Sequence, residues 1–318
     1  YGSLSFPTDL GSGGGTEGSI GGAGGGAVFI NATDTFNNSG KINASGLRSE
    51  DSDEGGGSGG SILIHAGTLK GNGEFTASGS DSFGNPATRG GGGGGGRIAV
   101  HYNMSDFKGS LSARGGIGVG AAGGGTIFLK ARNLSTVTLI FDNATRSSQN
   151  SQSAVNSSYG FDNDTLDIMI QPTAIVNQTI GFTAIRLRNL TVLGTFELSS
   201  RYAFITSMNV YILGGLLTHQ SNNDTHVSNI SLTAQNVTIA YGGLIGISGK
   251  GYAGRSCTAC PGFGPGGGGG QGGGDTKAGG GGSYGGYGEP NATTGYQAPL
   301  YGSLSFPTDL GSGGGTEG

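Results

Sequence analysis

The sequence has no tryptophan, only two cysteines and only eight prolines among its 318 residues. Charged residues make up 11%, the net charge is −4, and no basic block alternates with aromatic residues as nucleic-acid binding requires. No window approaches 18 continuous apolar residues, so no part of the sequence is predicted to span or contact a membrane. These absences argue against nucleic acid and membrane lipid as partners.

Glycine is the abundant residue, at 73 of 318, and only 33% of the residues are hydrophobic. This composition is too rich in glycine for an ordinary globular domain, and it lacks the strict Gly-X-Y period of collagen. The glycines therefore need another form of order, and their positions along the chain indicate which one.

The first eighteen residues, YGSLSFPTDLGSGGGTEG, occur again unchanged at residues 301–318. A match of this length, 300 residues apart, predicts a tandem array of near-identical units, of which this chain holds one period and the start of the next. The alternative is an overlap introduced when the sequence was assembled. Because the numbering begins at Tyr1, without a start methionine or signal peptide, we expect the chain to be a piece of a longer protein.

Asparagine indicates the compartment. Of 20 asparagines, 14 begin an Asn-X-Ser/Thr triplet, whereas about four would be expected by chance from 63 Ser and Thr residues. This excess predicts a secreted, heavily N-glycosylated protein, with covalent glycans and no other cofactor. The predicted glycosylation sites are Asn31, Asn37, Asn43, Asn103, Asn133, Asn143, Asn156, Asn163, Asn177, Asn189, Asn223, Asn229, Asn236 and Asn291.

The glycine tracts separate repeated strand templates. The first template begins with glycine followed by an alternating apolar run, and it appears at Gly26–Ala32, Gly60–Ala66, Gly96–Tyr102 and Gly125–Ala131. A second, shorter template follows the first three copies, at Gly40–Gly46, Gly73–Gly79 and Gly109–Gly115. Both alternate like strands, at spacings of 34, 36 and 29 residues between successive first templates.

Similar strands with shorter connections return at Ile185–Leu198, Phe204–Leu217 and Ile230–Ile245, with Asn189, Asn209 and Asn236 in register. Repeated strands without helices between them predict an all-β parallel β-helix, or solenoid, in which equivalent residues form columns. The predicted divisions are residues 1–132 (glycine-rich coils), 133–182 (an Asn/Ser-rich loop and irregular strands), 183–249 (shorter coils), 250–300 (a glycine-rich segment) and 301–318 (the next repeat).

Aligning the templates predicts the core. The inward columns are Val28, Ile62, Ile98 and Ile127; then Ile30, Ile64, Val100 and Leu129; and, on the second strand, Ile42, Phe75, Leu111, Phe196, Leu217 and Ile245. The outward column of Phe29, Leu63, Ala99 and Phe128 is also apolar, so a second layer is expected over it. The glycine tracts are the predicted layer, packed over this face as threefold extended helices similar to polyproline II.

At this stage the sequence resembles known families. The runs GSGGGTEGSIGGAGGGAVFINATDTFNNSGKINASG, GGSILIHAGTLKGNGEFTASG, GGRIAVHYNMSDFKGSLSARG and GGGTIFLKA are similar to glycine-rich parallel β-helix repeats of giant secreted surface proteins in protists and bacteria. The segment PGFGPGGGGGQGGGDTKAGGGGSYGGYG is similar in composition to glycine-rich domains of animal receptor ectodomains, where polyglycine helices pack side by side. The resemblance implies an extracellular or cell-surface location, such as a filament or a mastigoneme-like flagellar hair.

Three smaller motifs allow more than one interpretation. Cys257 and Cys260 are predicted to form a disulfide rather than a redox pair or half of a zinc site, since no other cysteine is present. The acidic run Glu50–Glu54 is interpreted as a solvated loop, because it lacks the spacing of calcium-binding loops. His65 and His101 are expected on one outward column about 5 Å apart, as a surface ladder rather than a metal site.

Enzyme activity is the rival class, since parallel β-helices host polysaccharide lyases and hydrolases that use clustered carboxylates. Outside Glu50–Glu54, the only acidic group of note is Asp142, Asp162, Asp164 and Asp167. These residues lie in or beside the Asn-rich loop, among sequons whose glycans would crowd a cleft, so no catalytic residue is predicted. The expected function is a structural repeat of a glycosylated extracellular filament that contacts itself head-to-tail, and a surface adhesin or glycan-binding β-helix is the alternative.

Overall fold

The computed structural model describes residues 2–51, 53–84, 89–143, 152–155, 165–178, 184–199, 203–222, 227–255, 257, 259–270, 278–291 and 295–316. It divides into two compact units. Unit 1 consists of Tyr1–Glu197, Phe204–Leu217 and Ser231–Ile245, and unit 2 consists of Leu198–Ala203, Thr218–Ile230 and Gly246–Gly318.

The fold is all-β, and the described residues contain no helix. Most strands pair in parallel. The strands are β1 (Ala27–Asn37), β2 (Lys41–Asn43), β3 (Ser61–Lys70), β4 (Glu74–Thr76), β5 (Arg97–Ser105), β6 (Ser110–Ser112), β7 (Gly125–Ala131), β8 (Thr136–Asp142), β9 (Gln152–Val155), β10 (Thr165–Ile170), β11 (Ile175–Gln178), β12 (Ala184–Val192), β13 (Thr195–Leu198), β14 (Ala203–Ile212), β15 (Leu216–His219), β16 (Ile230–Ile239) and β17 (Leu244–Ile245).

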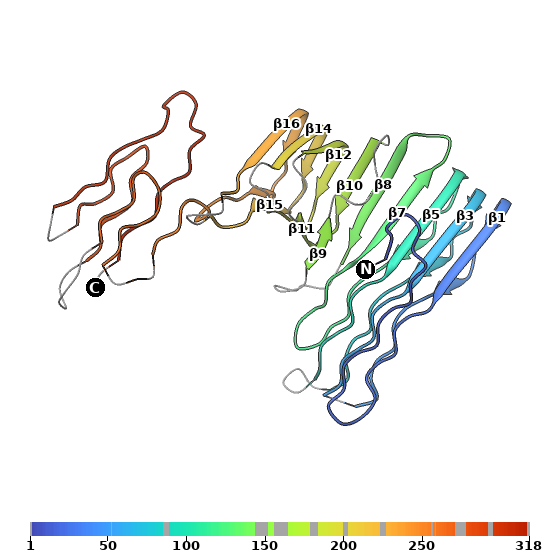
Figure 1. The fold of residues 1–318 in the computed structure, drawn as a ribbon. Coiled ribbons are helices and arrows are strands. Elements are labelled where there is room, and N and C mark those ends of the chain that lie inside the picture. The colour runs from blue at the N-terminus through green and yellow to red at the C-terminus, as the bar shows by residue number, and fades with distance from the viewer. Residues whose placement is uncertain are drawn as a thin grey trace. The chain divides into compact units, whose positions relative to one another are not determined.

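The strands form three sheets, and long and short strands alternate along the chain except at β7 and β8, two long strands that follow each other directly. The long strands make one sheet in the order β1-β3-β5-β7-β8-β10-β12-β14-β16 (Figure 1). The short strands make two sheets, β2-β4-β6 and β17-β15-β13-β11-β9. Within residues 133–182, the Asn/Ser-rich loop was expected at residues 143–163. Strand β9 lies in that range, so the expectation of a loop is wrong there, and most other residues of the range lie outside the described residues.

The strand register confirms most of the predicted columns. Val28 pairs with Ile62, Ile62 with Ile98 and Ile98 with Ile127. On the short strands, Ile42, Phe75 and Leu111 pair in turn, but Phe196, Leu217 and Ile245 belong to the other short-strand sheet. The inward side chains Ile62, Ile64, Phe75, Ile98 and Val100 are fully buried and form the core of the first half.

The chain direction reverses between β7 and β8, which pair antiparallel from Gly125 opposite Asp142 to Lys130 opposite Val137. All the other named strand pairs described are parallel. The expectation of parallel pairing throughout is therefore wrong at this point. The physical reason is the short connection of residues 132–135, which is long enough for a hairpin but not for a crossover. The missing second template after Gly125 is the sequence signal of this reversal.

The glycine tracts of unit 1 are ordered by backbone hydrogen bonds. They continue the strands as extended arms that run side by side beyond β1, β3, β5 and β7 (Figure 1). In the arm of residues 55–60, the six successive N–H groups donate at 2.8–3.0 Å to Gly15, Gly91, Leu47, Ser12, Gly94 and Ala44. N–H groups three residues apart thus donate to the same neighbouring arm. This three-residue rotation is that of a threefold extended helix, as the sequence analysis expected.

Glycine is required because the arms approach one another too closely for a side chain. A Cβ atom built on Gly57 would lie 1.9 Å from the carbonyl oxygen of Ala23. On Gly93 it would lie 2.0 Å from the oxygen of Gly57, and on Gly116 it would lie 1.8 Å from that of Ser80. Contacts this short do not occur for real Cβ atoms, so any other residue at these positions would force the neighbouring backbone to move.

The predicted place of the glycine layer is wrong. The glycine arms bond to one another beyond the strand ends. The outward residues Leu63, Ala99 and Phe128 are nevertheless buried, at 4%, 0% and 2% exposure, whereas Phe29 on the edge strand β1 is 56% exposed, so the expected cover does not extend to it. The layer over them is the segment Gly2–Leu10, which precedes the first glycine arm.

A ladder of polar side chains runs across the second half of the long sheet. Asn236 donates its side-chain amide to Asn209 at 2.9 Å, and Asn209 donates to Asn189 at 2.9 Å. Asn189 then donates to the carboxylate of Asp167 at 3.1 Å, and Asp167 also forms an ion pair with Arg188. The predicted alignment of the three asparagines is confirmed for Asn189 and Asn209 by the strand register, and Asn236 continues the row through its hydrogen bond.

Unit 2 contains a second set of glycine-rich arms. Gly313 donates to Phe263, Gly268 donates to Gly313, and Gly315 donates to Gly280, at 2.9–3.0 Å. A disulfide joins Cys257 to Cys260 in this set of arms. The backbone N–H of Cys260 donates to the hydroxyl of Thr316, so the disulfide loop lies against the repeated eighteen-residue segment.

We expect Gly57→Ala to lower the free energy of unfolding by roughly 1–3 kcal/mol or more, because its Cβ would overlap the carbonyl group of Ala23. Gly91→Ala is the matched control, since no atom lies within 4 Å of the added Cβ, and it should stay within about 0.5 kcal/mol of the parent. Urea unfolding followed by circular dichroism measures both. Equal destabilisation by the two substitutions would contradict close packing of the arms.

Candidate functional site

The segment Gly2–Leu10, called the covering segment below, lies on the outward side of the long strands. The hydroxyl of Ser61 on β3 donates to the carbonyl oxygen of Asp9 at 2.6 Å. Nε2 of His101 on β5 donates to the carbonyl oxygen of Ser5 at 2.7 Å. The segment holds its own turn, in which the N–H of Phe6 donates to the hydroxyl of Ser3 at 3.0 Å. Two strands therefore bind backbone carbonyl groups of the covering segment.

An aromatic cluster forms the centre of this contact. The ring of Phe6 stacks on His101, with ring centres 4.9 Å apart and planes 22° apart. Phe6 and His65 are arranged edge to face, with ring centres 5.9 Å apart. His65 and His101 are paired across β3 and β5, and their rings are 4.8 Å apart. Phe128 meets the other side of His101 at 5.4 Å.

Burial overturns the interpretation as a surface ladder for His101, whereas His65 is only partly buried. His101 is only 6% exposed, and Leu4 of the covering segment is 2% exposed. The predicted spacing of the two rings is confirmed, but the segment that buries His101 was not predicted. The available signal was the apolar pattern of Leu4, Phe6 and Pro7, which the sequence analysis treated only as a repeat and not as a surface.

The surroundings lower the pKa of both histidines. Burial is the main cause for His65, and the positive charge of Arg132 adds to it. Burial is also the main cause for His101; the hydrogen bond to Ser5 raises its pKa in opposition, while His65, Arg132 and Lys130 lower it further. Both rings are therefore neutral near pH 7, and no group of three or more possible metal ligands occurs among the described residues.

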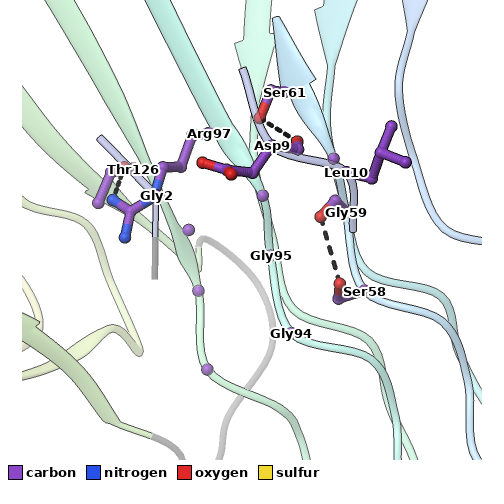
Figure 2. A pocket seen from close by; sticks show the side chains of 15 residues that line it. Gly2, Asp9, Leu10, Ser58, Gly59, Ser61, Gly94, Gly95, Arg97 and Thr126 are labelled. Atoms are coloured by element: carbon purple, nitrogen blue, oxygen red, sulfur yellow. Dashed lines mark hydrogen bonds between the residues drawn. The ribbon is translucent and has the colours of Figure 1, made fainter. Parts of the chain in front are cut away.

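A cavity of about 380 Å³ lies beside the covering segment, where the glycine arms enter β3, β5 and β7. Glycine backbone forms most of its wall, with Asp9 and Arg97 among the few charged side chains (Figure 2). The side chain of Arg97 on β5 donates to the hydroxyl of Thr126 on the neighbouring strand β7 at 3.2 Å. The cavity thus belongs to the same junction between covering segment, strands and arms.

The acidic run is not wholly a solvated loop. Glu54 is 2% exposed, and its carboxylate accepts hydrogen bonds from the successive N–H groups of Glu17, Gly18 and Ser19 at 2.8–3.0 Å. These backbone bonds, led by that from Gly18, hold the pKa of Glu54 below its ordinary value. Glu54 therefore fixes the turn that follows the first glycine arm, while Glu50, Asp51 and Asp53 are exposed.

The carboxylates considered for catalysis make structural contacts where they are described. Asp142 accepts hydrogen bonds from the N–H of Ala113 at 2.7 Å and from the hydroxyl of Ser112 at 3.2 Å. Asp167 holds the asparagine ladder and Arg188. Asp162 and Asp164 lie outside the described residues.

The predicted glycosylation sites fall into distinct surroundings. Six are exposed: Asn31, Asn37, Asn43, Asn103, Asn133 and Asn236. Three are partly buried: Asn177, Asn189 and Asn229. Asn143 and Asn291 are each 1% exposed, and Asn156, Asn163 and Asn223 lie outside the described residues. Asn31 and Asn37 lie on β1, the edge strand of the long sheet, and Asn43 lies on β2, the edge strand of the β2-β4-β6 sheet.

The two copies of the repeated segment share their local structure. The N–H of Phe306 donates to the hydroxyl of Ser303 at 3.1 Å, which reproduces the bond of Phe6 to Ser3. Gly2 and Gly302 have φ angles of 81° and 86°, in the left-handed region that glycine alone adopts readily. The glycine half of each copy is also bonded into neighbouring arms.

We expect the chain to lose stability as the pH falls through about 6.5, the ordinary histidine value, because the unfolded chain then takes up protons that the folded His65 and His101 do not. The loss continues until the pH reaches the lowered pKa values of the folded state. Thermal unfolding between pH 8 and pH 5 measures it. His65→Gln/His101→Gln should flatten this dependence, and an unchanged slope would contradict the assignment.

No helix among the described residues is long and apolar enough to cross a membrane. No protein-family model, no curated protein and no solved structure matches this chain. Function must therefore be inferred from the arrangement of its own residues.

Proposed function

We propose that this chain is a structural unit of a secreted, N-glycosylated protein filament. The observation that carries the proposal is the repeated segment, whose two copies lie 300 residues apart, share one local turn and are each bonded into a set of glycine arms. A chain that holds the first segment of a unit at two places can present equivalent surfaces at both. Surfaces that repeat without closing build a fibre.

We further infer that the stacked strands of unit 1 form a β-solenoid. On either side of the β7–β8 hairpin, long and short strands alternate along the chain, and the long strands pair in parallel. The same apolar columns continue through β1, β3, β5 and β7. At about 4.8 Å per strand, nine strands contribute on the order of 40 Å along the stacking direction. Such a sheet leaves open edges at β1 and β16, which a stacked neighbour would cover.

The extracellular location is supported by the sequons and the disulfide. Exposed asparagines beside the strands offer positions where glycans project without disturbing the core. The Cys257–Cys260 disulfide is typical of an oxidising compartment. Glycans at these positions would cover the sides of the fibre and oppose its lateral aggregation.

Electron microscopy of the native material is the test of this function. We expect fibres with an axial repeat of a few nanometres, because about nine strands stack in each unit. The fibres should become thinner after enzymatic removal of N-glycans while their axial repeat stays the same. Single particles without a repeat would contradict the filament, and screening against polysaccharides would then be the next measurement.

Mass spectrometry of glycopeptides tests the proposed surface. We expect glycans at exposed sequons such as Asn31, Asn37 and Asn103 and none at Asn143 or Asn291, because a side chain that is 1% exposed leaves no room for a sugar. Asn143 and Asn291 serve as internal controls, since each begins the same Asn-Ala-Thr triplet as Asn31. Full occupancy at the two buried sites would contradict the fold around them.

A further inference from the structure

Each copy of the repeated segment has an apolar half (residues 1–10 or 301–310) and a glycine half (residues 11–18 or 311–318). The described residues of the two apolar halves differ in how far they are buried. Leu4 is 2% exposed, whereas Leu304 is 101% exposed. Phe6 is 53% exposed and Phe306 is 75% exposed, and Pro7 is buried whereas Pro307 is exposed. The sequence of Gly2–Leu10 is thus docked on a sheet in the first copy, and the same sequence at Gly302–Leu310 is largely uncovered in the second.

The glycine halves do not differ in this way. Gly11 and Gly14 of the first copy donate to Gly25 and Gly22. In the second copy, the glycine half is bonded on several sides, through Gly311, Gly313 and Gly315. Each copy is therefore anchored at its glycine end, and the second copy presents Gly302–Leu310 from that anchor.

We propose that Gly302–Leu310 docks on the outward face of β3, β5 and β7 in a second copy of this unit. This inference rests on the proposed function, and it names the contact that joins one unit to the next. The first copy demonstrates the fit, because an identical sequence already occupies that face. Leu304 takes the place of Leu4, Phe306 stacks on His101, and the carbonyl group of Ser305 accepts from Nε2 of His101.

The face has the properties that such a contact needs. Its apolar residues Leu63, Ala99 and Phe128 are buried, and the segment Gly2–Leu10 is bonded to Ser61 and His101 on the same strands. Its polar atoms, the hydroxyl of Ser61 and Nε2 of His101, bind only backbone carbonyl groups of the segment. Within one chain this face binds the chain's own Gly2–Leu10, which has the same sequence and the advantage of being tethered to the face. A second segment therefore needs a face from which Gly2–Leu10 has been weakened or displaced.

This competition provides a matched test, because Leu4→Asp and Leu304→Asp are the same substitution in the same local sequence. Leu4→Asp weakens the chain's own covering segment and leaves Gly302–Leu310 intact. Sedimentation velocity should show concentration-dependent association of Leu4→Asp chains. The double variant Leu4→Asp/Leu304→Asp should associate at least about tenfold more weakly, because it lacks the buried leucine in both copies.

Two outcomes would overturn the inference: Leu4→Asp chains that stay monomeric, or single and double variants that associate equally. Circular dichroism checks that the aspartate variants fold. If they do not fold, the milder variants Leu4→Ala and Leu4→Ala/Leu304→Ala take their place in the same measurement. Electron microscopy separates this inference from the proposed function. If wild type and Leu304→Asp form fibres equally well, the proposed filament function stands, but the proposal that Gly302–Leu310 joins the units is wrong.

A peptide gives an independent measurement. A fluorescent peptide of residues 1–10 should bind the Leu4→Asp chain in an anisotropy titration, and the same peptide with Leu4→Asp should bind at least about tenfold more weakly. Equal binding of the two peptides would show that the face does not recognise the leucine, and the inference would fail.

Discussion

Close approach of one backbone to another is the constraint on which this structure depends. In the arm of residues 55–60, every N–H donates to another segment, and a Cβ at Gly57 or Gly93 would fall about 2 Å from a carbonyl oxygen. Ordering glycine costs about 1–2 kcal/mol per residue in backbone entropy, and one hydrogen bond returns about as much. The arms are therefore stable only as a set, and the buried columns of β3 and β5 hold their ends in position.

The covering segment depends on the same anchor. Its glycine end is bonded to the arms through Gly11 and Gly14, which places Leu4 and Phe6 over β3 and β5 without further secondary structure. Because the arm already fixes one end of the segment near β3 and β5, the apolar half loses less conformational entropy when it binds there. The same reasoning applies to the second copy, in which the anchor is in place and the apolar half is uncovered.

Local repetition made the strands and most of the core predictable from the sequence, because equivalent residues such as Ile62 and Ile98 recur at equal positions in each template. The threefold arms could also be predicted, since tracts without side chains can pack only through their backbones. The cover over His101 could not, because Ser5 is 96 residues away and nothing local indicates which surface an apolar turn will meet. The reversal between β7 and β8 is indicated only by the absence of a second strand template after Gly125, and an absence is not what a search for repeats detects. The roles of Glu54 and Asp142 were missed for a related reason, since each binds N–H groups that are distant in sequence.

The arms give the molecule a distinct response to temperature. Hydrophobic cores produce the large positive heat-capacity change of unfolding, whereas exposure of polar groups lowers it. An arm such as residues 55–60 exposes peptide groups and almost no apolar side chain when it unfolds. Its contribution to stability therefore varies less with temperature than that of the β3–β5 core and persists in the cold, where hydrophobic burial weakens. Cooling therefore weakens the β3–β5 core, which holds the ends of the arms, before it weakens the backbone hydrogen bonds of the arms themselves.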